Sequence, residues 1–110
     1  MIYFMEGLKI TGLEDLNEKE QQAANELIQK NYEKLMNHLG DDIKVSVTLK
    51  AHKLNKENEE KRHKYSITLK VEAKTKMFKS DKNSGFEIYN VIKNAFKDIE
   101  EEVNKKFNKA

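Results

Sequence analysis

The fold is decided by the stretch IKVSVTLKA at residues 43–51, in which every second residue is apolar. The stretch YSITLKVEA at residues 65–73 repeats the alternation. Successive side chains of a β-strand point to opposite faces of a sheet, so the pattern predicts two strands, each with one buried and one solvated face. Residues 55–61 lie between them without an apolar side chain, which predicts a solvated hairpin loop.

Apolar residues at three- and four-residue steps predict two helices. The first is expected over residues 18–39, and Asn17 with Glu20 three residues later has the form of a capping box at its start. The second is expected over roughly 22 residues from Ile88. A loop at residues 81–85 precedes it, since this segment is polar and ends in glycine.

Two shorter strands complete the prediction, at residues 8–11 and about residues 76–80, and residues 2–5 either extend the first or fray. The resulting order, β-α-β-β-β-α, is an α+β fold in which a four-stranded sheet carries both helices on one face. Residues 1–110 are expected to form one domain, since two independent cores need a longer chain. The helices are expected to cover the sheet through Leu27, Leu35, Ile92 and Ile99, against Val45, Val47, Leu49, Ile67, Leu69 and Val71. Tyr65, Tyr89, Phe96 and Phe107 are expected in the same core.

Composition limits the classes of protein to which the chain can belong. Without cysteine, neither a disulfide framework nor a thiolate zinc site is possible. The apolar start at residues 1–5 is too short for a secretory signal or a membrane span. We therefore expect a cytoplasmic protein.

The charge is distributed unevenly, although the formal net charge is only +2. Residues 1–42 hold four basic and nine acidic groups, whereas residues 43–82 hold twelve basic and five acidic groups. Such a basic segment can contact phosphates. Every cation except Arg62 is a lysine, which binds phosphate as a point charge and cannot read guanine edges with a planar fork. Any nucleic-acid contact is therefore expected to follow backbone and shape.

The stronger candidates for phosphate contact are six lysines that the chain places around the start of the second helix: Lys74, Lys76, Lys79, Lys82, Lys93 and Lys97. Lys93 and Lys97 are four residues apart and share a helix face. The strand lysines Lys44, Lys50, Lys64 and Lys70 are the weaker set, because lysines on a solvated face ordinarily serve solubility and deter edge pairing.

Element order and three short motifs resemble the ribosome hibernation-promoting factors, also called the ribosome-associated inhibitor or protein Y family. The first strand ends in Ile-Thr-Gly at residues 10–12, and the first helix closes with Lys30 and with Glu-Lys-Leu at residues 33–35. The last helix opens with Tyr89, Ile92 and Ala95 at the family's spacing. The resemblance spans about residues 8–107.

The resemblance implies binding to the small ribosomal subunit near the decoding region, which inhibits translation during dormancy, in a stress response. It implies ribosomal RNA contacts by Lys30 and Lys34 as well as by the six lysines above. It also implies a monomeric short form without a dimerisation domain, a cofactor or a small-molecule substrate. The chain departs from the family at Lys93, where aspartate is common, and at Asp98 and residues 100–102, where acids replace basic residues.

Catalytic and metal-binding functions are disfavoured. His38, His52 and His63 lack the spacing of a metal site, and no phosphate loop or nucleophile motif occurs. Residues 41–42 and 100–102 are interpreted as surface acids rather than paired catalytic carboxylates. Two other functions remain open: a double-stranded-RNA-binding-like domain, although the chain lacks the proline of that fold's turn, and a protein-interaction module whose acidic second helix binds a basic partner.

Overall fold

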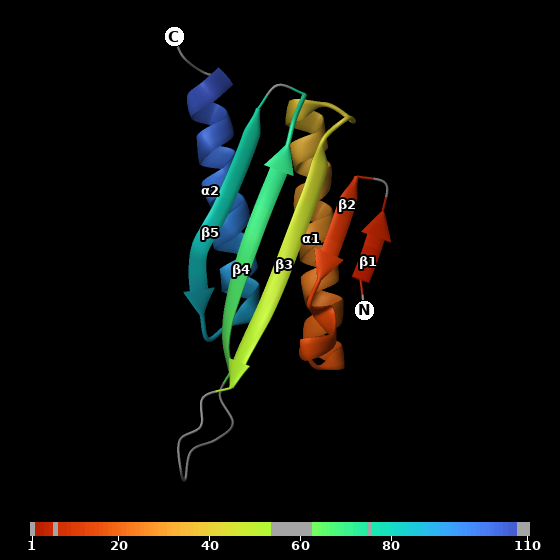
Figure 1. Ribbon diagram of the computed structural model, residues 1–110, viewed down its shortest axis with the longest axis vertical. Coiled ribbons are helices and arrows are strands. Elements are labelled where there is room, and N and C mark those ends of the chain that lie inside the picture. The colour runs from red at the N-terminus through yellow and green to blue at the C-terminus, as the bar shows by residue number, and fades with distance from the viewer. Residues whose placement is uncertain (1, 6, 54–62, 75, 108–110) are drawn as a thin grey trace.

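The computed structural model describes residues 2–5, 7–53, 63–74 and 76–107. Five strands form one sheet in the order β1-β2-β3-β4-β5 (Figure 1). Their bounds are Ile2–Met5, Leu8–Thr11, Lys44–Lys53, His63–Glu72 and Met77–Gly85. Neighbouring strands are antiparallel, except that β2 and β3 are parallel and are joined through the first helix.

Two long helices, α1 (Glu18–Leu39) and α2 (Ile88–Phe107), cover the same face of the sheet (Figure 1). A short 3-10 helix, η1 (Leu13–Asp15), connects β2 to α1. The predicted capping box is present: the Asn17 side chain accepts from the Glu20 backbone N–H at 2.8 Å, and Glu20 Oε1 accepts from the Asn17 N–H at 3.2 Å. Two otherwise unpaired N–H groups are thereby satisfied, and α1 begins and ends where the sequence predicts.

The alternating stretches of β3 and β4 form the centre of the core. They pair in register from Lys44 opposite Glu72 to Lys53 opposite His63, so the apolar side chains of both strands point toward the helices. All six predicted strand residues are buried, as are Leu35, Ile92 and Ile99 of the helices, while Leu27 is partly buried. The predicted α+β fold, with both helices on one sheet face, is confirmed.

The sheet has five strands and not the predicted four, because the N-terminal segment forms a strand of its own. Residues 2–5 neither extend β2 nor fray, but form β1, which pairs antiparallel with β2. Gly7 makes the reversal possible with a φ of +82°, and its carbonyl accepts from the Val45 N–H at 2.7 Å. A Cβ at this position would meet the Tyr32 hydroxyl and the Ile43 carbonyl, so only glycine allows β2 to lie this close to its neighbours.

The segment at residues 81–85, predicted as a loop, instead continues β5. Ser80 pairs with Leu69 and Asn83 with Ile67, so β5 contains one extra residue opposite Thr68, a β-bulge. Because of the bulge, Ser80 and Asn83 both face α2. Asn83 donates to Asp98 Oδ2 at 2.8 Å and to Ser80 Oγ at 3.0 Å, and Ser80 Oγ donates to Asp98 Oδ2 at 3.3 Å.

The aromatic residues fit the predicted core in part. Tyr65 and Phe96 are buried, but Tyr89 is 48% exposed, because Val91 and not Tyr89 continues the buried stripe that begins at Ile88. The side chain of Phe107 and the predicted loop at residues 55–61 lie outside the described part of the chain.

Candidate nucleic-acid interface

Among the described residues, the sheet face opposite the helices carries more basic than acidic side chains. On β2–β5 the side chains that alternate with the core point to this open face, and they are mainly lysines, serines and threonines with few acids, together with His52 and the exposed Met77. The lysines are Lys9, Lys44, Lys50, Lys64, Lys70 and Lys79, and the acids are Glu72 and Asp81. The net charge of these groups is +4, twice that of the whole chain.

One row of the open face crosses four strands. Lys9 lies opposite Ser46, Ser46 opposite Lys70, and Lys70 opposite Lys79. Adjacent strands are about 4.8 Å apart, so the row spans roughly 14 Å. Lys70 and Lys79 lie on adjacent strands, within a Debye length of about 8 Å at physiological salt, so their potentials add. Lys9 is two strand spacings from Lys70, about 10 Å, so salt partly screens it from the other two lysines.

Threonines and serines fill the next rows. Thr11, Thr48 and Thr68 are aligned across β2, β3 and β4, and Ser66 lies opposite Lys50. His52 shares a hydrogen bond of 3.3 Å with the Ser66 hydroxyl. Hydroxyl groups both donate and accept, so these rows suit phosphate and sugar oxygens equally.

Acids reduce the positive charge of the open face at two points. Lys79 Nζ lies 3.4 Å from Asp81 Oδ2, and both side chains are about half exposed. An ion pair this exposed contributes little to stability and can open when a phosphate approaches. Glu72 lies opposite Lys44 at the end of the sheet where β2 begins.

The helix lysines lie on the other side of the molecule. Ile88, Ile92 and Ile99 define the side of α2 that faces the sheet, and Lys93 and Lys97 lie on its opposite, exposed side. Lys30 and Lys34 are similarly exposed on α1, away from the buried stripe of that helix. The charged residues of α1 and α2 comprise eight acids and seven lysines, so the helix layer has no net positive charge comparable with that of the open face.

The predicted grouping of Lys76 and Lys79 with the start of α2 is wrong. β5 runs opposite in direction to α2, so residues that begin the strand lie beside the end of the helix (Figure 1). Lys79 and Lys82 line a hollow with Asp98, Glu101 and Lys105, and the neighbouring hollow includes Met77 and Lys106. Lys74 and Lys76 are exposed at the β4–β5 turn. The eight predicted lysines therefore do not form one patch, and only Lys79 belongs to the row on the open face.

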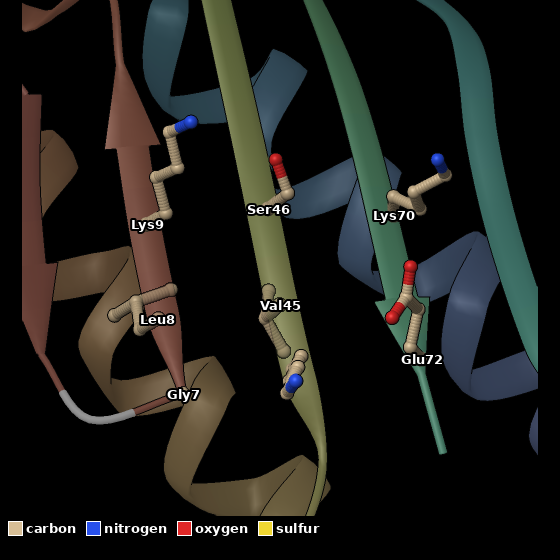
Figure 2. Close-up of a pocket in the computed structure, with 8 residues that line it drawn as sticks. Gly7, Leu8, Lys9, Val45, Ser46, Lys70 and Glu72 are labelled. Carbon is tan, nitrogen blue, oxygen red and sulfur yellow. The ribbon is translucent and has the colours of Figure 1, made fainter. Parts of the chain in front are cut away.

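A shallow hollow of about 320 Å³ lies on the open face where β2, β3 and β4 meet the turn at Gly7. Figure 2 shows Lys9, Ser46, Lys70 and Glu72 standing on the same side of the three strands. Lys44 also lines it. The sequence indicated the strand lysines, but it did not indicate that Lys9 joins them, because that depends on the parallel pairing of β2 with β3.

Among the residues that the structure describes, the one ionisable group with a strongly shifted pKa is Tyr65, on the core side of the sheet. Tyr65 donates its hydroxyl hydrogen to Glu20 Oε2 at 2.6 Å, which ties β4 to the capped start of α1. Burial and the neighbouring carboxylate raise the pKa of Tyr65 to about 12. No group of three metal-ligating side chains occurs among the described residues, and neither α1 nor α2 is long and apolar enough to cross a membrane.

Comparisons with protein-family models, with curated proteins and with solved structures find no match to this chain.

Proposed function

We propose that this chain is a non-catalytic RNA-binding protein that holds the phosphate backbone on its open sheet face. The observation that carries the proposal is the row Lys9–Ser46–Lys70–Lys79 on the sheet face that neither α1 nor α2 covers. Phosphate contacts by lysine release condensed counterions and supply affinity without reading sequence.

The same face gives no support for stacking of unpaired bases. No described phenylalanine or tyrosine side chain lies on the open face of β2–β5, whereas sheet platforms that bind single strands present aromatic rings to the bases. Lysine and hydroxyl rows favour a folded RNA, whose shape and backbone they can follow.

The small ribosomal subunit is the RNA-rich target that the resemblance to hibernation factors favours, with inhibition of translation during dormancy as the consequence. In this proposal the sheet face contributes the main RNA contacts. Lys30, Lys34, Lys93 and Lys97 lie on the helix layer and would reach RNA only where it wraps around the domain.

Co-sedimentation with ribosomal subunits over a series of salt concentrations tests the proposal. We expect the protein to sediment with the small subunit at low salt. Its affinity should fall steeply as the salt concentration rises, because cations of the salt then replace the lysines around the phosphates. Binding to protein-free ribosomal RNA with a similar salt slope would identify RNA as the ligand. Binding to neither, or binding that salt does not weaken, would contradict a lysine–phosphate interface.

An interaction with a basic protein through α2 is the second candidate, favoured by the acids at residues 98 and 100–102. Glu101 and Glu102 are exposed and line one hollow with Asp98. Glu101→Lys separates the two functions: it should leave RNA binding intact or strengthen it, and it should abolish binding to a basic protein.

A further inference from the structure

The hollow at the Gly7 end of the open face contains a combination of charges that phosphate binding alone does not explain. Lys9, Lys44 and Lys70 line it together with the Ser46 hydroxyl, and Glu72 lies among them. A carboxylate at this place repels a phosphate and weakens the attraction of the lysines. A bare phosphate site would be stronger without it.

The strand register explains why these five side chains share one hollow. Lys44 and Ser46 are two residues apart on β3, and Lys70 and Glu72 are two residues apart on β4, so both pairs point to the open face. Lys44 pairs with Glu72, and Ser46 lies between Lys9 and Lys70. The carboxylate is therefore at the edge of the lysine row, one step toward the end of the sheet, as Figure 2 shows.

Glu72 has no visible structural role. It is exposed, and within the described part of the chain it makes no hydrogen bond or ion pair, although Lys44 is its cross-strand neighbour. Its carboxylate is an acceptor-only group that is open to the hollow. A ligand with an O–H donor beside its phosphate can bind the lysines through the phosphate and the Glu72 carboxylate through the O–H group.

We propose that the hollow binds a ribose-phosphate unit of RNA and distinguishes RNA from DNA. Lys9, Lys44 and Lys70 surround the phosphate, the Ser46 hydroxyl donates to one of its oxygens, and Glu72 accepts a hydrogen bond from the adjoining 2′-hydroxyl. DNA lacks that hydroxyl, so it meets only the repulsion of the carboxylate. This inference rests on the proposed function and names the chemical feature of the RNA that the same face selects.

Gly7 keeps this corner of the sheet in place. Its backbone pairs with Val45 beside the hollow, and any side chain would meet Tyr32 and Ile43 on the side away from solvent. Leu8 and Val45 contribute to the floor of the hollow while their side chains are buried in the core. The site is thus built on paired strands that the core fixes, and not on a loop.

The test compares the affinity of one protein for an RNA hairpin and for the DNA hairpin of the same sequence, at one low salt concentration. Wild type is expected to prefer RNA. Glu72→Ala removes the acceptor and the negative charge, so DNA binding should strengthen and the RNA-to-DNA preference should fall about tenfold, the effect of losing one charge-assisted hydrogen bond. Glu72→Gln removes the charge but keeps an amide oxygen as acceptor, so both affinities should rise while much of the preference remains.

Each outcome decides between the two proposals. If Glu72→Ala strengthens RNA and DNA binding equally, Glu72 is only a repulsive charge; the inference about the 2′-hydroxyl is then wrong and the proposed RNA-binding function stands. If wild type binds neither hairpin at low salt, both proposals are wrong. Because Glu72 is exposed, both variants should melt with wild type, and their melting curves verify that the fold is intact.

Discussion

The two faces of the sheet are built from the same strands and differ in almost every other respect. On β3, Val45, Val47 and Leu49 are at most 2% exposed under the helices, whereas Lys44, Ser46 and Lys50 alternate with them on the open face. The side chains of the covered face are apolar because they pack against the helices. The open face has a selected set of lysines and hydroxyls, although solubility requires only that it be polar.

This difference separates the residues that make the fold from those available for function. The free energy of folding comes mainly from burial of the covered face, so changes there are expected to act on stability. Changes on the open face remove little buried area and are expected to act on binding. Substitutions on each face test whether stability and binding separate in this way.

The largest effect is expected for Ile92→Ala on the covered side. Ile92 has no exposed surface and lies at the centre of the stripe that packs α2 onto the sheet. The lost burial and the remaining cavity should cost about 2–5 kcal/mol of the free energy of unfolding. Urea denaturation measures it. Lys93→Ala, the next residue on the exposed side of α2, is the matched control and should change stability by less than about 0.5 kcal/mol.

The next variant exchanges two lysines of the open face for acids. Lys70→Glu with Lys79→Glu should weaken RNA binding strongly and lower the log–log salt slope by about 0.7–0.9 for each phosphate contact that is lost. The melting temperature should remain close to wild type, since both side chains are exposed.

Lys93→Glu with Lys97→Glu makes the same change of charge on the helix layer and is the control. We expect this pair to keep most of its RNA affinity, because both lysines point away from the sheet. If the helix pair loses binding and the sheet pair keeps it, the RNA site is on α2 and the assignment to the open face is wrong.

Much of the fold could be predicted because its signals are local. The alternation in residues 43–51 and the capping box at Asn17 depend only on neighbours in sequence, and both gave the right element and, for α1, the right ends. β5 could not be bounded in this way. Its polar segment at residues 81–85 forms a strand only because β4 provides a partner and a bulge turns Asn83 toward Asp98.

The candidate site was less predictable, because it depends on which strands pair. Lys9 is 35 positions before Lys44 in the sequence, and only the parallel pairing of β2 with β3 brings both to one hollow. Lys79 and Lys93 are close in sequence, yet one lies on the open sheet face and the other on the far side of α2. Proximity in sequence thus indicated a cluster that the direction of β5 does not allow.

The polar contact between Asp98 of α2 and the β5 residues Ser80 and Asn83 allows a test of whether the covered side is stabilised by apolar burial alone. Asp98→Ala removes the carboxylate that accepts from Ser80 and Asn83, and Ser80 is a buried polar side chain. The loss of these partners should cost about 1–3 kcal/mol. Thermal unfolding measures it, and Lys97→Ala on the same helix is the control. An unchanged stability would mean that water replaces the carboxylate and that the bulge needs no anchor.

The smallest effect is expected at the rim of the covered face, where Tyr65 donates to Glu20. Tyr65→Phe keeps the ring and removes the hydrogen bond, so at neutral pH it should cost about 1 kcal/mol. The pKa of Tyr65 is raised to about 12 in the folded protein from 10.0. Below pH 10 the phenol keeps its proton in both states, and the full contribution is present. Between pH 10 and about 12 the unfolded state loses its proton first, which favours unfolding, so the contribution declines and is lost above pH 12.

The difference between wild type and Tyr65→Phe in urea denaturation, measured at pH 8 and pH 11, isolates this effect because the other tyrosines and the lysines are common to both proteins. A difference that stays constant between the two pH values would mean that the phenol and the Glu20 carboxylate are not coupled in solution, and that the rim, like the centre of the covered face, is stabilised by packing alone.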